Sequence, residues 1–318
     1  MTARTPAAPL LDRGQVITHK NVKYALSARD TFEAEVEPGE VFEVDTELNI
    51  GGHLITHPDD RLTEADINVP YVNPATGPIR VNGARPGDTL HVRVLDVGVR
   101  GLGYTALWPK FSIFGDPLAE RPADIQARVV RVEDGLIHWS DTLTLDAHPM
   151  IGLVGVAPAA GEVMTLDNGP HGGNLDIQEV TNGSTISFRV HHDGAYLYFG
   201  DVHALQGDGE SSGMGAVEIR GRLRIQVDVA PPTPRLHWPR IETATHIATT
   251  GCARPVDDAM RTAFAEMIHW LQAGYGLTST EAQLLLGPTA QARCTQMVNP
   301  HYTYICKIDK RYLPEPRN

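Results

Sequence analysis

The chain contains little cysteine and no long hydrophobic run. Its three cysteines, Cys252, Cys294 and Cys306, are too few and too scattered for a disulfide framework or a CxxC metal site, and we interpret them as buried, reduced thiols. No apolar run approaches the ~20 residues that a membrane-spanning helix needs. The N-terminal segment lacks the continuous apolar stretch of a signal peptide. We therefore expect a flexible tail over residues 1–20, a cytoplasmic protein and no membrane partner.

The sequence also lacks a high charge density and the familiar catalytic signatures. Charged residues make up 21% of the chain and the formal net charge is −12, which argues against nucleic acid as a partner. There is no GxSxG elbow, HExxH motif, P-loop, dinucleotide fingerprint or Ser-Ser-Lys amidase signature. If the chain is a hydrolase, water activated by a metal is the simplest mechanism that these absences leave.

Strand and turn patterns dominate what is present. The chain has 30 glycines and 23 prolines among its 318 residues, and many short runs alternate between apolar and polar side chains. Residues 89–97 form a long alternating run, and a hairpin is predicted over residues 128–144 with its turn at residues 133–135. These patterns predict a mainly β fold.

Helical patterns are confined to the C-terminal part. Residues 256–273 place apolar side chains on one face, with acidic residues in the first turn, which predicts a helix. A second helix is predicted after Thr278, which can cap it while Glu281 reaches back. A strand is expected over residues 240–249 and a closing hairpin over residues 294–308.

These patterns divide the chain into four parts, with a proline-rich linker at residues 231–234. The parts are the tail (1–20), an N-terminal β domain (21–149), a second β segment that carries the candidate site (150–234) and an α+β part (235–318).

Residues 101–122 are rich in glycine and aromatic side chains and have no clear period. Their aromatic residues include Tyr104, Trp108, Phe111 and Phe114. The segment could fold over a pocket or form a hydrophobic patch beneath a long connection. We favour the patch, because long connections often bury their aromatic side chains.

The run from Phe199 to Glu210 crowds acidic groups around one imidazole. Asp201 and His203 stand near its start, and Asp208 and Glu210 follow within a few residues. Carboxylates at close range repel one another unless a cation, a proton or a polar network compensates them. Asp201 and His203 are separated by one residue, so they would point to the same face of a strand. The run therefore predicts a metal site, with a hydrolytic one as the leading hypothesis.

Other glycine-rich or polar segments supply further candidates, which in chain order are Glu47 and His53, then His148, and then His171, Asn174 and Asp176. Zinc favours nitrogen and carboxylate ligands and leaves a position for water, whereas oxygen ligands suit calcium. Each candidate also has a structural interpretation. A histidine beside glycine is more often a turn or core residue than a ligand, and Asp176 or Asp208 can cap a turn.

At these motifs the chain resembles the acetamidase/formamidase family. The resemblance rests on several segments in the same order and spacing: residues 73–78, 83–90, 149–158, Gly169-Pro170-His171-Gly172-Gly173-Asn174-Leu175-Asp176, and Gly200-Asp201-Val202-His203 to Gly207-Asp208-Gly209-Glu210. It covers most of the chain from about Asn21 onward, including the C-terminal helices. Two departures stand out. Leu48 occupies a place where many members carry aspartate, and His148 one where many carry asparagine.

The resemblance implies a β-sandwich or jelly-roll-like fold with a smaller α+β part, in a cytosolic homo-oligomer. It implies hydrolysis of a short amide, such as formamide or acetamide, to a carboxylate and ammonia, with a divalent metal that is zinc or, alternatively, calcium. For the residues of the matching motifs, the roles that follow are metal binding by His171, Asp176, Asp201 and His203, catalysis by Glu210, Asp208 and His203, and substrate binding by Asn174. At or beside the two departures, we also expect metal binding by Glu47 and substrate binding by His53 and His148.

Three hypotheses for the function remain open at this point. In the first, activated water attacks the amide carbon, Glu210 or Asp208 shuttles the proton, and backbone N–H groups bind the oxyanion. In the second, the protein is a non-enzymatic β-sandwich whose acidic loops bind structural calcium. In the third, a pair of carboxylates performs acid–base catalysis without a metal.

Overall fold

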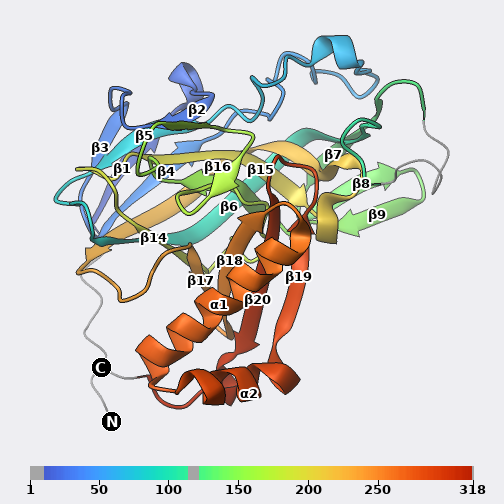
Figure 1. Cartoon of the computed structure of the whole chain (residues 1–318). Coiled ribbons are helices and arrows are strands. Elements are labelled where there is room, and N and C mark those ends of the chain that lie inside the picture. Colours follow the sequence, from blue (N-terminus) through green and yellow to red (C-terminus); the bar gives the residue numbers. More distant parts are fainter. Residues whose placement is uncertain (1–10, 114–121, 317–318) are drawn as a thin grey trace.

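The computed structural model describes residues 11–113 and 122–316, and it is mainly β, as predicted (Figure 1). The first ten strands are β1 (Leu11–Ile17), β2 (Ala25–Ser27), β3 (Ala34–Val36), β4 (Glu40–Asp45), β5 (Thr76–Val81), β6 (Thr89–Leu107), β7 (Gln126–Glu133), β8 (Leu136–Ser140), β9 (Leu143–Asp146) and β10 (Met150–Gly155). The others are β11 (Glu162–Met164), β12 (Asn168–Gly169), β13 (Gly172–Asn174), β14 (Thr185–Arg189), β15 (Leu197–Leu205), β16 (Gly213–Ala230), β17 (Arg240–Glu242), β18 (His246–Ala253), β19 (Gln291–Gln296) and β20 (Tyr302–Asp309).

Within the described residues, all strands but β2 and β11 are hydrogen-bonded into one curled sheet. Two long strands organise it, because β6 pairs along its length with β16 and also borders β7 and β14. Strand β16 in turn borders β4 and β15, which brings the sequence-distant β4, β6 and β15 around a single strand. Most pairings are antiparallel, but β1–β4 and β3–β5 are parallel.

The main hydrophobic core lies between the faces of this curled sheet. Alternate residues of β6 and β16 point inward, among them Val92, Val94, Leu223 and Ile225, and all four are fully buried. Burial of each such side chain contributes about 1.5–3 kcal/mol relative to exposure. The alternation in the sequence therefore predicts both the strands and the face that they bury.

The C-terminal part packs two helices on one face of the β17–β18–β20–β19 strands, as Figure 1 shows in orange and red. Helix α1 (Val256–Tyr275) and helix α2 (Ser279–Thr289) confirm the two predicted helices. Thr278 and Glu281 form the expected capping box. No helix in residues 11–113 and 122–316 is long and apolar enough to span a bilayer.

Short 3-10 turns complete the described chain at η1 (His19–Asn21), η2 (Glu64–Asp66), η3 (Asp208–Glu210) and η4 (Lys310–Tyr312). The hairpins predicted over residues 128–144 and 294–308 are present as β7–β8 and β19–β20. The strand expected over residues 240–249 is two strands, because the chain turns at residues 243–245 and pairs β17 with β18.

The prediction of a tail over residues 1–20 is wrong for its second half. Leu11–Ile17 form β1, which lies parallel to β4. Strand β1 is held by backbone pairing and by contacts such as Asp12 with Arg224 (2.9 Å), and of its described side chains only Ile17 is buried. It therefore lacks the hydrophobic alternation that reveals a strand in a sequence. Residues 1–10 lie outside the described residues, as does Phe114.

Gly251 marks the closest approach of α1 to the sheet. A Cβ atom at Gly251 would lie 2.2 Å from the Ala259 carbonyl oxygen and 2.7 Å from the Ala263 nitrogen, both in the helix backbone. We expect Gly251→Ala to lower the free energy of unfolding by about 1–3 kcal/mol, because the helix must move. Gly287→Ala in α2 meets nothing within 4 Å and should raise it by about 0.5–1 kcal/mol. Urea denaturation of both variants tests this, and equal effects would contradict it.

Candidate active site

Three buried side chains from β15 and the loop after β13 converge on one point. Each of Asp176, Asp201 and His203 offers a ligand atom, and these atoms all lie within 4.8 Å of one another. Asp201 and His203 lie two residues apart on β15, as their spacing predicted, and Asp176 approaches from the neighbouring loop. None of the three side chains is more than 3% exposed.

Glu218 on β16 completes this group from the adjacent strand. His203 Nε2 lies 3.2 Å from both Asp201 Oδ2 and Glu218 Oε2, but neither contact has the alignment of a hydrogen bond. Within the described chain, Asp176 Oδ1, Asp201 Oδ1 and Glu218 Oε2 are likewise buried without a hydrogen-bond partner. Buried polar atoms are rarely left unpaired in proteins, so this convergence of lone pairs fits a divalent cation.

Gln206 fixes the protonation of the imidazole. Its NH2 group donates to the backbone oxygens of Asp176 (3.0 Å) and Thr295 (2.9 Å), so its side-chain oxygen must face His203. That oxygen lies 2.9 Å from His203 Nδ1 and can only accept a hydrogen bond. Nδ1 therefore carries a proton, which leaves Nε2, directed at the carboxylates, as the nitrogen that can bind a metal once it has lost its own proton.

The backbone is strained at three acids of this site. Asp176, Asp201 and Glu210 have φ angles of 50°, 49° and 46°. A residue other than glycine held in this left-handed region costs on the order of 1–3 kcal/mol, and such residues cluster at functional sites. The fold thus places these three carboxyl groups where a relaxed backbone would not.

Burial and mutual repulsion shift the pKa values of the site. Burial, followed by the charge of Asp201, raises the pKa of Asp176 well above its ordinary value. Burial and the carboxylates around it likewise raise the pKa of Glu210, and that of Glu218 to about 7. Burial opposes a charged His203, but Glu218 and Asp201 outweigh it and raise the pKa of the imidazole. Of these groups, Glu218 is therefore placed to exchange a proton near neutral pH.

A small cavity of about 60 Å³ opens onto these acids. Its polar residues are Asn49, Asn73, Asn174, Asp201, Glu210, Glu218 and Asn299, and its apolar ones include Val69, Val72, Trp108, Phe111, Leu166, Met214 and Val298. Trp108 and Phe111 thus line a pocket and also belong to a hydrophobic cluster, so both interpretations of the aromatic segment hold in part. Tyr104 is fully buried behind them and donates to Asn49 Oδ1 (2.8 Å).

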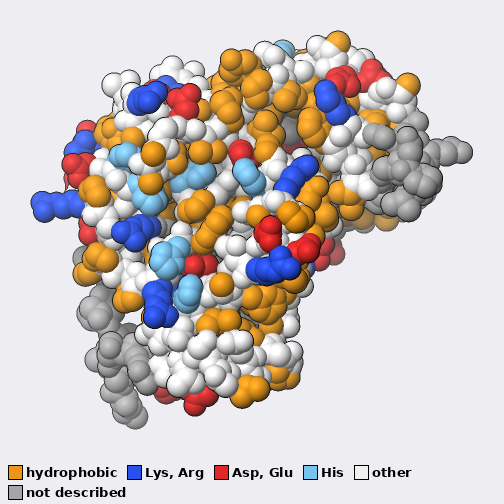
Figure 2. Space-filling view, viewed as in Figure 1, with side chains coloured by type: hydrophobic (Ala, Val, Ile, Leu, Met, Phe, Trp, Pro, Cys, Tyr) orange, Lys and Arg blue, Asp and Glu red, His pale blue; other side chains and the backbone are white. Residues whose placement is uncertain are grey.

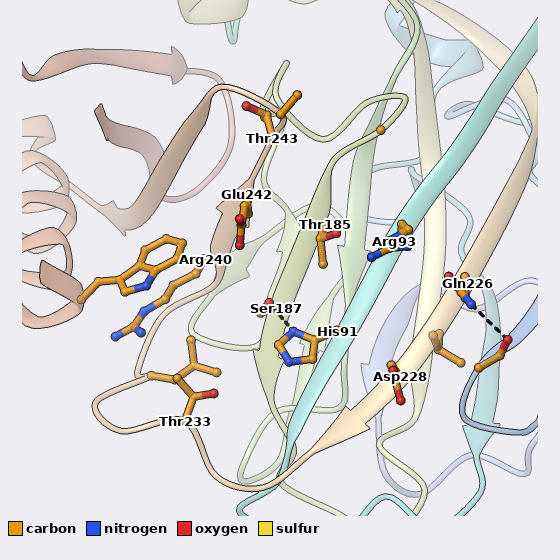
Figure 3. A pocket seen from close by; sticks show the side chains of 16 residues that line it. His91, Arg93, Thr185, Ser187, Gln226, Asp228, Thr233, Arg240, Glu242 and Thr243 are labelled. Carbon is orange, nitrogen blue, oxygen red and sulfur yellow. Dashed lines mark hydrogen bonds between the residues drawn. The ribbon is translucent and has the colours of Figure 1, made fainter. Parts of the chain in front are cut away.

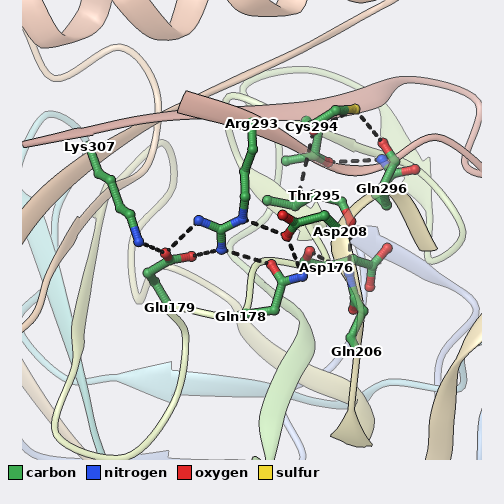
Figure 4. A network of polar contacts seen from close by, with 11 residues as sticks. Asp176, Gln178, Glu179, Gln206, Asp208, Arg293, Cys294, Thr295, Gln296 and Lys307 are labelled. Atoms are coloured by element: carbon green, nitrogen blue, oxygen red, sulfur yellow. Dashed lines mark hydrogen bonds and ion pairs between the residues drawn. The ribbon is translucent and has the colours of Figure 1, made fainter. Parts of the chain in front are cut away.

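Asp208 lies outside this cavity and belongs to a surface network (Figure 4). Its carboxylate is 60% exposed and binds Arg293 Nε at 2.7 Å. Arg293 also binds Glu179 (2.7 Å), which Lys307 contacts at 2.8 Å. Because Asp208 and Glu210 share the η3 turn, the network holds in place the turn that presents Glu210.

The other predicted site residues do not join the converging group. Glu47 binds Arg220, and His53 and His148 are exposed. His171 is buried, and burial lowers its pKa to about 4, but it does not belong to the candidate ligand group of Asp176, Asp201 and His203. Leu48, the departure from the family pattern, is a core residue. Asn174 does line the cavity, next to Asp176 (3.3 Å).

Sequence reasoning missed Glu218, Gln206 and Asn299. Asn299 donates to Asp176 Oδ2 (2.7 Å) from the β19–β20 loop, far away in the sequence. Glu218, Arg220 and Arg222 lie at every second position of β16, on one face of the strand. Arg220 and Arg222 are exposed, so the alternation predicts that Glu218 also faces solvent. A signal for Gln206 existed, since it follows His203 by three residues within the acidic run.

Gly152 on β10 makes room for the carboxylates. A Cβ atom there would lie 2.6 Å from both Asp176 Oδ1 and Asp201 Oδ2. We therefore expect Gly152→Ala to lower the affinity of this site for a divalent metal such as zinc at least tenfold, since it displaces two candidate ligand oxygens. Gly207→Ala, which meets nothing within 4 Å, is the control. Isothermal titration with zinc measures both affinities, and an unchanged affinity in Gly152→Ala would contradict the assignment.

A larger cavity than the acidic one lies elsewhere in the described chain. It is an open groove of about 800 Å³ along β6, β14, β16 and β17. Figure 3 shows His91, Arg93, Asp228 and Glu242 spread along these strands, so charges of both signs line it without converging. The smaller, acidic cavity is therefore the better candidate for an active site.

The family model for the acetamidase/formamidase family matches residues 30–168 and 162–307. The chain belongs to this family. Its curated relatives include a formamidase of Methylophilus methylotrophus, which is 30% identical over 246 residues, covering 61% of this chain and 60% of that protein. The aligned part of the chain thus spans less than two thirds of this relative.

Solved structures of the family share the whole fold. An acetamidase from Yersinia enterocolitica is 32% identical with a TM-score of 0.88, covering 95% of this chain and 93% of that one. An acetamidase from Bacillus halodurans is 31% identical with a TM-score of 0.86, covering 93% and 98%. The predicted β fold with a smaller α+β part is therefore confirmed.

Proposed function

We propose that the chain is an amidase that hydrolyses a short linear amide to a carboxylate and ammonia in the acidic cavity. The observation that carries this is the convergence of unpaired carboxylate oxygens and one imidazole nitrogen at the base of a cavity of about 60 Å³. Formamidase and acetamidase relatives support the reaction class. The small volume favours formamide or acetamide over amides with longer acyl chains.

Asp176, Asp201, His203 and Glu218 would hold a divalent metal there. One nitrogen and several carboxylate oxygens suit zinc, whereas an imidazole ligand disfavours calcium. Such a metal supplies the Lewis acidity that activates water toward the amide carbon. The same argument disfavours the structural-calcium alternative.

Glu210 and Asn174 would act on the substrate. The raised pKa of Glu210 favours its protonated form, so the carboxyl group holds a proton that it can give to the leaving nitrogen. Asn174 Oδ1 is buried and has no hydrogen-bond partner within residues 11–113 and 122–316, and it can accept from the amide NH2 group. We propose that Asp208, 60% exposed, positions the η3 turn instead of transferring a proton.

Release of ammonia from a series of amides tests the proposal. We expect turnover of formamide and acetamide, a steep fall in kcat/KM from propionamide to butyramide, loss of activity after chelation and recovery with zinc. Full activity in the chelated protein would favour the carboxylate-pair mechanism, and no ammonia from any amide with zinc, calcium or manganese would contradict the proposal.

The expectations on assembly and surroundings also remain proposals. We propose a homo-oligomer in the cytoplasm that binds no nucleic acid. On the face shown in Figure 2, Lys and Arg side chains are scattered among hydrophobic and acidic ones instead of forming a continuous basic surface, which supports the last point. Light scattering after gel filtration measures the oligomer size.

A further inference from the structure

A second group of potential metal ligands lies where the 231–239 connection crosses helix α1. His237 comes from this connection, and Glu266 and His269 lie one turn apart on α1. One ligand atom from each lies within 4.8 Å of the other two. His237 Nδ1 is 3.1 Å and His269 Nδ1 is 3.4 Å from the same oxygen, Glu266 Oε1.

These distances match the spacing of ligands around one ion. Zinc binds histidine nitrogen and carboxylate oxygen at about 2.0–2.2 Å, which separates ligand atoms in a tetrahedron by roughly 3.3 Å. Two imidazoles and one carboxylate are a ligand set that zinc uses when it keeps a fourth, open position. The side chains of His237 and His269 are 53% and 35% exposed, so an ion can reach the group from solvent.

The burial of Glu266 provides an independent argument for a ligand. Glu266 is 4% exposed, and its second oxygen, Oε2, is buried without a hydrogen-bond partner in the described part of the chain. A buried oxygen without a hydrogen bond carries a desolvation penalty. Hydrogen bonds from the two histidines would use only Oε1 and would leave the penalty at Oε2 uncompensated. A cation bound by both oxygens of Glu266 would remove this penalty.

The neighbouring charge is Arg240, which lines the large groove with Trp270. Burial lowers the pKa of Arg240 to about 10, and the charge of Glu266 opposes that shift. No ion pair within 4.0 Å joins Arg240 to Glu266 among the described residues, so the carboxylate is not committed to the guanidinium. Its positive charge moderates the affinity for a cation but does not occupy the ligand atoms.

We infer that His237, Glu266 and His269 form a zinc site separate from the acidic cavity. The ion would join the 231–239 connection to α1, where Arg235 already donates to Gln272 (2.8 Å). It would thereby tie the long strand β16 to the C-terminal helices. This inference does not depend on the proposed amidase activity, since it shares no residue with the acidic cavity.

The zinc content of wild type and of the double variant His237→Gln/His269→Gln, measured after dialysis against micromolar zinc, tests the inference. The matched control is His57→Gln/His138→Gln, which removes two exposed histidines outside the group. We expect wild type and control to retain one zinc equivalent per chain more than the variant. Cobalt loading should give a tetrahedral absorption band that the variant loses in part, while ammonia release stays within twofold of wild type.

Glu266→Gln guards against loss of the fold in the double variant, because it keeps the shape of the side chain and removes its charge. It should lose the same zinc equivalent while keeping the far-UV circular dichroism of wild type. Equal zinc content in wild type, both variants and the control would overturn the inference and favour a water molecule between Glu266 and Arg240.

Discussion

We expect Asp201→Asn to abolish zinc binding in the acidic cavity and, with it, the release of ammonia. Asp201 combines an unpaired oxygen, full burial and a position 3.2 Å from His203 Nε2. The affinity for zinc should fall by more than the roughly 10–100-fold that follows loss of a group which only orients a ligand. Isothermal titration and ammonia assays on the same preparation measure the two effects.

The same variant should be more stable than wild type once both are chelated. Without a cation, Asp176, Asp201 and Glu218 lie together in a buried site, where burial and the charge of Asp201 raise the pKa of the other two, so removing the Asp201 charge relieves repulsion. With zinc present the order should reverse, because only wild type gains stability from binding. Asp193→Asn, which changes an exposed aspartate just before β15, should shift neither melting temperature. A lower Tm for chelated Asp201→Asn than for chelated wild type would argue for a structural role instead.

Glu210→Gln should lower kcat for acetamide by about 10²–10⁴-fold while the zinc content stays at the wild-type level. Glutamine keeps the shape of the side chain, but it holds no carboxyl proton to give to the leaving nitrogen. The raised pKa of Glu210 comes from burial and from Asp176, so the protonated form exists because of the site around it. Stopped-time ammonia assays and metal analysis separate this loss from a loss of zinc.

Asp208→Asn is the comparison that decides between the two acids of the η3 turn. Its carboxylate contacts Arg293 at the surface, so we expect a decrease of less than tenfold through a looser turn. Equal losses in kcat for Asp208→Asn and Glu210→Gln would place proton transfer on Asp208 or on both, and would contradict the roles proposed here.

Local patterns predict the elements of this protein well. The helix over residues 256–273 has both a periodic apolar face and a capped neighbour, and it appears within two residues of its predicted end. Asp201 and His203 could be paired because the period of a strand is fixed. In both cases the signal lies within a few residues of the chain.

The rest of the site depends on contacts between distant segments. Glu218 looks like a surface residue beside Arg220 and Arg222, and only the pairing of His203 with Glu218 across β15 and β16 buries it. From the sequence, we predict Glu47 as a metal ligand. The turn of the chain, however, directs Asn49 to the cavity and Glu47 to Arg220. Beyond the end of a strand, where the alternation of side chains stops, the local sequence does not predict which of two nearby residues faces the cavity.

The position of Asn299 means that the C-terminal part cannot be removed without losing the site. All four proposed ligands precede residue 219, yet Asn299 donates to Asp176, and Gln206 donates to the Thr295 backbone oxygen. The Met297 nitrogen also donates to the Gly209 oxygen in the η3 turn (3.0 Å). A fragment ending at the linker (residues 231–234) would keep all four proposed ligands. It would lose the hydrogen bonds from the C-terminal part that align Asp176, His203 and the turn of Glu210. The proposed site therefore needs the α+β part as well as the β strands before it, although all four proposed ligands precede the linker.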